Sequence, residues 1–161
     1  MTGRALFTSE EWDLLVKVPR WVVRAASASQ PDNARRTAIE VEAGFLSVAE
    51  GREMGSDLVK EIAQATMGIY DEEHGLPEAA GITFDDMETG LTRVLEQAQA
   101  AVKLMAAKAP TDAPTYRQWL LAISDVVVSA ARSNDILGIG GVYVTEAEAR
   151  FDRRLEAATE M

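Results

Sequence analysis

Cysteine is absent from the 161 residues, which excludes disulfides, thiolate metal sites and a thiol nucleophile. Histidine occurs once, in the run Asp71-Glu72-Glu73-His74. Four consecutive residues at a helix end point in different directions, so this run is interpreted as a solvated helix end rather than a metal site or general base. With one histidine and no Gly-x-Ser-x-Gly elbow, the sequence assigns no catalytic residue.

Long hydrophobic runs are also missing. No segment has eighteen uncharged apolar residues, and the N-terminus has no long apolar core, so we expect a soluble, cytoplasmic chain without a membrane span. Lys and Arg number 16 against 26 Asp and Glu, a formal net charge of -10. This charge repels phosphate backbones and argues against nucleic-acid binding.

What is present is helical periodicity. Glycine and proline fall between segments with apolar residues at three- and four-residue steps, which predicts an all-α, single-domain bundle of about six helices over residues 1–161. Thr8 and Glu11 form a capping box, so the first helix should start near Ser9. Pro19 should kink or restart this helix. A cap formed by Thr115 and Gln118 should start the fifth helix.

The inward face of each helix follows from the same spacing. The expected inward residues are Ile39, Ala43, Leu46 and Met54 in the second helix; Leu58, Ile62, Ala65 or Thr66, and Ile69 in the third; Phe84, Met87, Leu91, Val94, Ala98, Ala101 and Met105 in the fourth; Tyr116, Trp119, Leu120, Ile123, Val127 and Ala130 or Ala131 in the fifth; and Ala147, Phe151 and Leu155 in the last.

Two segments echo each other at a shift of 105 residues. Residues 14–26 align with residues 119–131, so that Leu15 meets Leu120 and Val22-Val23 meets Val127-Val128. Chance agreement among alanine and valine is easy in a helical chain. A duplication would give two pseudo-symmetric halves.

The most distinctive stretch is residues 133–151, a glycine-punctuated apolar loop between two helical patterns. Connecting loops are normally polar because their backbone groups face water, so this loop should pack against the core of the chain or against a partner. The loop residues assigned to an interaction or structural role are Ile136, Leu137, Gly138, Ile139, Gly140, Gly141, Val142 and Tyr143.

Nucleotide binding and divalent-cation binding are the two chemical functions that the residues of this loop suggest. The glycines lack the preceding strand and following lysine of a phosphate-binding loop, so no nucleotide is expected. Asn134 and Asp135 before the glycines, with Glu146 and Glu148 after them, could surround a divalent cation if the loop folds back. The spacing differs from a twelve-residue calcium loop, and helix capping and turn roles explain the same residues.

Parts of the sequence resemble a group of mostly bacterial helical proteins without an established activity. The matching residues are Trp119-Leu120-Leu121, the glycine-rich residues 137–141, Val144-Thr145-Glu146-Ala147-Glu148, Phe7-Thr8-Ser9-Glu10-Glu11-Trp12 and Pro19. More distantly, a helix ending in Ala-Ala, an acidic turn and a helix opening with Thr-x-x-Glu are similar to tellurite-resistance TerB-like domains. That resemblance implies two related helical halves, an acidic cation-binding face and a role in bacterial stress or defence. Only Asp135 and Glu148 map onto its acidic positions, and the Asp-Gly turn of the pattern is missing.

These observations predict a non-enzymatic bacterial interaction or stress-associated protein, with a homodimer or a protein partner covering surplus apolar surface. No cofactor is identified. The first alternative is a TerB-like module that binds a divalent cation through Asp135 and Glu148. The second is an enzyme of unrecognised type.

Overall fold

The computed structural model describes residues 3–28, 34–73, 87–135 and 146–161. Within them the chain forms six α-helices, two short 3-10 helices and no strand, which confirms the prediction of an all-α bundle. The elements are η1 (Arg4–Leu6), α1 (Ser9–Ala28), α2 (Ala34–Glu50), η2 (Gly51–Glu53), α3 (Asp57–Glu73), α4 (Met87–Lys108), α5 (Ala113–Asp135) and α6 (Glu146–Ala158).

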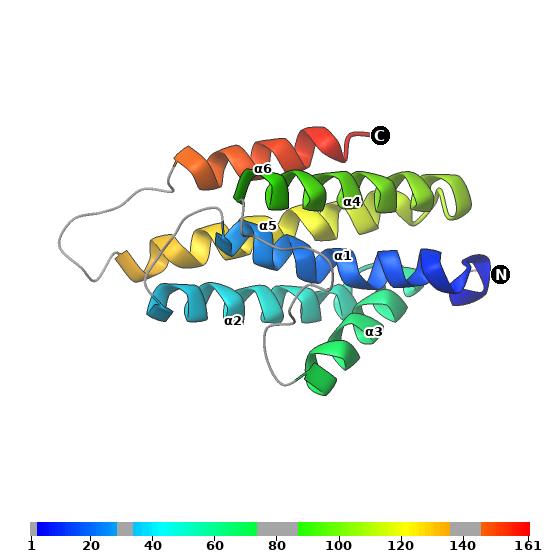
Figure 1. The fold of residues 1–161 in the computed structure, drawn as a ribbon. Helices are drawn as coiled ribbons and strands as arrows, with labels where there is room; N and C mark the ends of the chain where they lie inside the picture. The colour runs from blue at the N-terminus through cyan, green and yellow to red at the C-terminus, as the bar shows by residue number, and fades with distance from the viewer. Residues whose placement is uncertain (1–2, 29–33, 74–86, 136–145) are drawn as a thin grey trace.

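Helix α1 is central, because it contacts each of the other five helices. Helix α5 lies beside it and runs in the same direction, whereas α2, α4 and α6 run the opposite way and α3 crosses obliquely (Figure 1). The two segments whose sequences echo each other are therefore neighbouring, parallel helices. Their origin by duplication stays a prediction.

The predicted start of α1 is confirmed by its side-chain cap, and α3 begins with a cap of its own. The Thr8 Oγ1 accepts from the Glu11 backbone amide at 3.2 Å, and the Glu11 carboxylate accepts from the Thr8 amide at 2.7 Å. Ser56 Oγ accepts from the Val59 amide at 3.0 Å at the start of α3. The hydrogen bond from Lys108 lowers the pKa of Glu11, so this carboxylate stays charged at neutral pH.

The prediction for the start of α5 was wrong by three residues. The helix begins at Ala113, and the Asp112 carbonyl already accepts from the Tyr116 amide at 3.0 Å, while Thr115 lies within the first turn. Pro114 is the second residue of this helix. In the first turn it removes an amide that has no partner inside the helix, so it is tolerated there.

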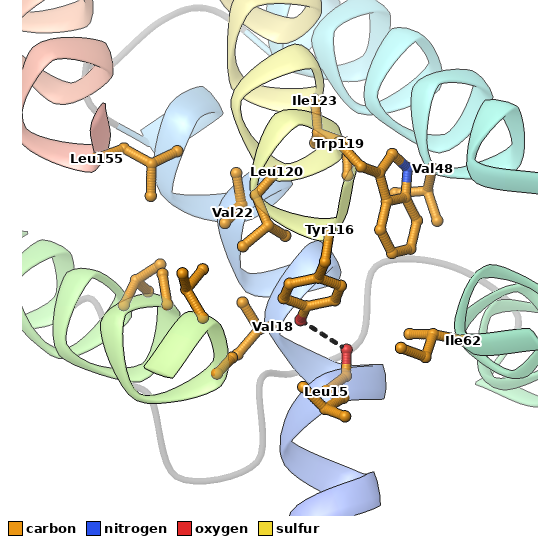
Figure 2. Close-up of a cluster of buried hydrophobic side chains, with 14 of the residues drawn as sticks. Leu15, Val18, Val22, Val48, Ile62, Tyr116, Trp119, Leu120, Ile123 and Leu155 are labelled. Atoms are coloured by element: carbon orange, nitrogen blue, oxygen red, sulfur yellow. Dashed lines mark hydrogen bonds between the residues drawn. The ribbon is translucent and has the colours of Figure 1, made fainter. Parts of the chain in front are cut away.

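Helix α1 passes through Pro19 without ending. A proline at this position cannot donate to the carbonyl of Leu15, four residues earlier. The Tyr116 hydroxyl of α5 supplies the missing donor at 2.9 Å (Figure 2), and burial raises the pKa of this phenol, which keeps its proton. The Thr66 hydroxyl of α3 donates to the next carbonyl, that of Val16, also at 2.9 Å. The donor that the proline lacks is thus replaced by a hydroxyl group of α5.

The predicted inward faces of α3, α4, α5 and α6 are confirmed where their side chains are described. Trp119 and Tyr116 are the two largest of the fully buried side chains, and their rings meet edge to face with centroids 5.9 Å apart. Figure 2 shows these rings between α1, α2 and α3. The predicted residues that prove buried are Leu58, Ile62, Thr66, Leu91, Val94, Ala98, Ala101, Met105, Tyr116, Trp119, Leu120, Ile123, Val127, Phe151 and Leu155.

The prediction that Leu46 of α2 points inward was wrong. Leu46 is 58% exposed, and Val48 is the fully buried apolar side chain on a face of α2 that otherwise carries small or polar buried residues. A Cβ on Gly44 would lie 2.5 Å from a methyl of Val23 and 2.9 Å from one of Val127. Gly44 therefore lets α2 approach α1 and α5 closely, and a hydropathy pattern does not reveal this role. The buried residues on this face are Glu40, Gly44, Ser47 and Val48, followed by Gly51 at the start of η2.

Candidate functional site

The residues singled out in the sequence lie only partly within the described structure. Asp135 is the last residue of α5 and Glu148 lies in the first turn of α6, and for both only the backbone is described. The interaction loop of residues 136–143 lies outside the described residues. The structure thus defines the two helices that carry these residues, and the site itself stays a prediction.

The pairing of α5 with α6 sets how far apart the two acidic residues lie along the bundle. Ser124 donates to Asp152, and further along Arg117 Nε donates to the Thr159 carbonyl at 2.8 Å, so the helices are antiparallel. In this register, position 148 is level with position 128. Asp135 lies seven residues farther on, which is roughly 10 Å along the helix axis. The helical register alone therefore does not bring the two residues together.

Several helix ends gather at the end of the bundle from which the loop departs. The C-terminal ends of α1 and α5 and the N-terminal ends of α2 and α6 point toward this end (Figure 1). One turn inside it, the Ser27 hydroxyl of α1 donates to the Glu40 carboxylate of α2 at 2.8 Å, and both side chains are buried. A buried carboxylate that accepts a hydrogen bond from a neighbouring helix links α1 to α2.

Sequence reasoning missed Glu40, because it assigned to the core a face of α2 that is displaced by one residue, about 100° around the helix axis. A signal for the true face was present. Glu40, Gly44, Ser47 and Gly51 recur at steps of four, three and four residues, which places them on one side of a helix. A stripe of small residues at that spacing indicates close helix packing.

The second polar contact of interest lies between α5 and α6. Ser124 has no exposed surface, and its hydroxyl donates to the Asp152 carboxyl. Burial raises the pKa of Asp152, the hydrogen bond from Ser124 lowers it, and the nearby carboxylates of Asp125 and Glu156 raise it further. The net effect is a raised pKa, so the protonated form is favoured in the folded chain more than in an unfolded one.

Within residues 3–28, 34–73, 87–135 and 146–161, no group of three or more His, Asp or Glu side chains is arranged to hold a metal ion. None of the described helices is long and apolar enough to cross a membrane. An open surface depression belongs to the solvent face of a single helix, α4, and no second described element contributes to it. It is lined by Glu88, Thr89, Thr92, Arg93 and Glu96.

The comparisons with known proteins gave no match: no family model, no curated protein and no solved structure is significantly similar to this chain.

Proposed function

We propose that this chain is a non-enzymatic protein-interaction module, and that two copies associate through the end of the bundle that carries residues 136–143. The observation that carries the proposal concerns the two flanking helices. Both α5 and α6 bury their own apolar faces in the described core, with Trp119 and Ile123 on one and Phe151 and Leu155 on the other. The sequence between these helices contains further large apolar residues, among them Ile136, Leu137 and Ile139.

The distribution of large apolar residues also supports an interaction surface formed by residues 136–143. Among the residues that the structure describes, the exposed large apolar side chains are Leu46 and Met161. The segment between α5 and α6 instead concentrates Ile136, Leu137 and Ile139 within four positions. An anchor of this kind is typical of the centre of a protein interface.

The proposed biological setting rests on a sequence resemblance and on the charge of the chain. A stress-associated role in a bacterial cytoplasm is suggested by the resemblance of the second half of the sequence to TerB-like domains. The acidic balance of the chain, 26 Asp and Glu against 16 Lys and Arg, is compatible with a protein partner and disfavours a nucleic acid.

Sedimentation velocity over a range of concentrations tests the proposed association. We expect Leu137→Asp to weaken it by about tenfold or more, because loss of a buried apolar anchor commonly costs at least about 2 kcal/mol. Leu46→Asp is the matched control, since it places the same charge on a leucine that is already 58% exposed in α2. A wild-type chain that stays monomeric at every concentration would refute the proposal, as would equal weakening by both substitutions.

A cation-binding module is the alternative proposal. It is favoured by the positions of two acidic residues on either side of the apolar segment. Asp135 is the last residue of α5, Glu148 lies in the first turn of α6, and these two helices contact each other. This alternative predicts that millimolar calcium raises the midpoint of thermal unfolding, because a ligand that binds only the folded state stabilises it. Asp135→Ala combined with Glu148→Ala should abolish the rise, whereas Asp13→Ala on the exposed face of α1 should preserve it. An unchanged midpoint with calcium, magnesium and manganese would eliminate the alternative.

A further inference from the structure

The N-terminal residues 3–8 form a strap at one end of the bundle, and they bury little of their own surface (Figure 1). The strap consists of η1 and the residues that lead into α1. Phe7, which is 9% exposed, is the buried side chain among them. Its ring meets that of Trp12 in α1 with centroids 6.3 Å apart, and the Arg4 guanidinium carbon lies 5.8 Å from the centroid of the same Trp12 ring. A segment with so few buried side chains belongs to the part of a fold that opens most easily.

A lysine from another helix fastens the strap. Lys108 is the last residue of α4, and its Nζ donates to the Glu11 carboxylate at 2.6 Å and to the Leu6 carbonyl at 3.3 Å. The same Nζ lies 5.9 Å from the centroid of the Phe7 ring. A single ammonium group thus contacts a carboxylate, a carbonyl and an aromatic ring, all within residues 6–11. The contacts of Lys108 to residues 6–11 are named the clasp.

The clasp acts on the point where the strap joins α1. Glu11 Oε2 accepts from Lys108, and the same oxygen accepts from the Thr8 amide at 2.7 Å. A second link from the strap to another helix, from the Arg4 amide to the Glu61 carboxylate of α3, is 3.4 Å long and correspondingly weak. The side chains of Lys108 and Glu11 are 35% and 28% exposed, so dissolved salt can screen their attraction. The clasp is therefore the stronger polar fastening of the strap, and it depends on charge.

We propose that the strap is a charge-clasped cover, which opens independently of the helices when the attraction between Lys108 and Glu11 is weakened. In the closed form Phe7 and Trp12 are buried, at 9% and 6% exposure. Opening takes Phe7 into solvent and uncovers the Trp12 ring, because Phe7 and the Arg4 guanidinium are the groups of the strap that lie against it. The open form thus presents two aromatic side chains, a type that dominates the energetics of protein interfaces, and the closed form hides them.

Native-state hydrogen exchange of the full chain, resolved by NMR at increasing urea concentrations below the unfolding transition, tests whether the strap opens by itself. The reporters are the amides of Leu6 and Phe7, which donate to carbonyls within the strap. Their exchange should be faster than that of Val22 inside α1 and nearly independent of urea, because opening of the strap exposes little surface. Exchange at the buried Val22 should accelerate with urea, because it requires unfolding of the bundle.

Salt and a charge-removing substitution test whether the clasp controls this opening. Raising sodium chloride from about 0.05 to about 1 M should accelerate exchange of the Leu6 and Phe7 amides about two- to fivefold, the effect expected for a partly exposed ion pair. Lys108→Met keeps the aliphatic stem and removes the charge, so it should accelerate the same amides about five- to twentyfold and abolish the salt response. Lys103→Met, at an exposed lysine of the same helix, should preserve the wild-type rates and the salt response.

Three results would overturn the proposal. The first is a urea dependence of the strap amides equal to that of Val22, which would show that the strap opens only with the bundle. The second is a salt response that persists in Lys108→Met. The third is equal acceleration by Lys103→Met and Lys108→Met, since either of the last two results would show that Lys108 does not control the opening.

Glu11→Gln provides a second test should Lys108→Met fail to fold. A glutamine at this position still accepts from the Thr8 amide, so the helix keeps its cap while the clasp loses its negative charge. The salt response of the strap amides should therefore disappear in Glu11→Gln. Its persistence in this variant would equally refute the proposal.

Discussion

Gly44→Ala is expected to destabilise the fold by about 1–3 kcal/mol, a cost typical of overpacking a filled core. Alanine normally stabilises a helix interior by about 1 kcal/mol relative to glycine, so the expected sign is the reverse of the usual one. The added methyl would lie 2.5 Å from Val23 and 2.9 Å from Val127, on two different helices. Both neighbours are short, buried and β-branched, so neither can move aside without shifting its backbone. Urea denaturation monitored by circular dichroism measures the change.

Gly68→Ala is the matched control for this substitution. Gly68 lies inside α3, and a Cβ there would meet nothing within 4 Å. The exchange should therefore stabilise the protein by about 0.5–1 kcal/mol, the ordinary gain for an exposed helical glycine. Stabilisation by both substitutions would show that α2 does not approach α1 and α5 as closely as described.

Tyr116→Phe is expected to cost about 1–3 kcal/mol, because it leaves the Leu15 carbonyl buried without a donor. The phenol donates to this carbonyl at 2.9 Å, and Pro19 cannot replace it. Removal of the hydroxyl leaves the ring in place, so the cost should come from the hydrogen bond rather than from a cavity. The free energy of unfolding from urea titration is the measurement.

Pro19→Ala tests whether the proline is the reason for that cost. Alanine restores the backbone amide that bonds the Leu15 carbonyl within α1, so the penalty of Tyr116→Phe should shrink in this background. The two substitutions should be coupled by about 0.5–3 kcal/mol, the range seen for residues that share one hydrogen-bond network. Strictly additive costs would mean that the tyrosine is not compensating for the proline.

The sequence predicted those helices whose core faces consist of large apolar residues. The faces of α4 and α5 were recognised because residues such as Val94 and Met105, or Trp119 and Ile123, recur at helical spacing and are buried. The start of α1 was recognised because its cap is formed by residues three positions apart. Local signals of this kind do not depend on the partner helix.

The features that sequence reasoning missed depend on contacts between segments far apart in the chain. The face of α2 is set by Val23 and Val127 fitting against Gly44, and apolar periodicity favoured Leu46 instead. The continuity of α1 through Pro19 depends on a hydroxyl from α5, about a hundred residues later. Neither the identity nor the direction of such a partner can be read from the local sequence.

The candidate site could be predicted only as a place in the chain. The sequence located Asp135 and Glu148 on either side of the apolar loop, and the structure assigns them to the end of α5 and the first turn of α6. Their separation along the bundle follows from the register between these helices, which Ser124 and Asp152 fix by tertiary contact. Sequence spacing contains no information about that register.

Hydroxyl-radical footprinting of the wild-type chain, over concentrations that span the proposed association, tests the central functional claim most directly. The proposal predicts that Leu137 and Tyr143 lose reactivity as the concentration rises, while Leu46, exposed on α2, reacts equally throughout. The protection should accompany a change in mass from 17.5 kDa to twice that value. Reactivity of Leu137 and Tyr143 that is high and independent of concentration would contradict the assignment of this segment as the interaction surface.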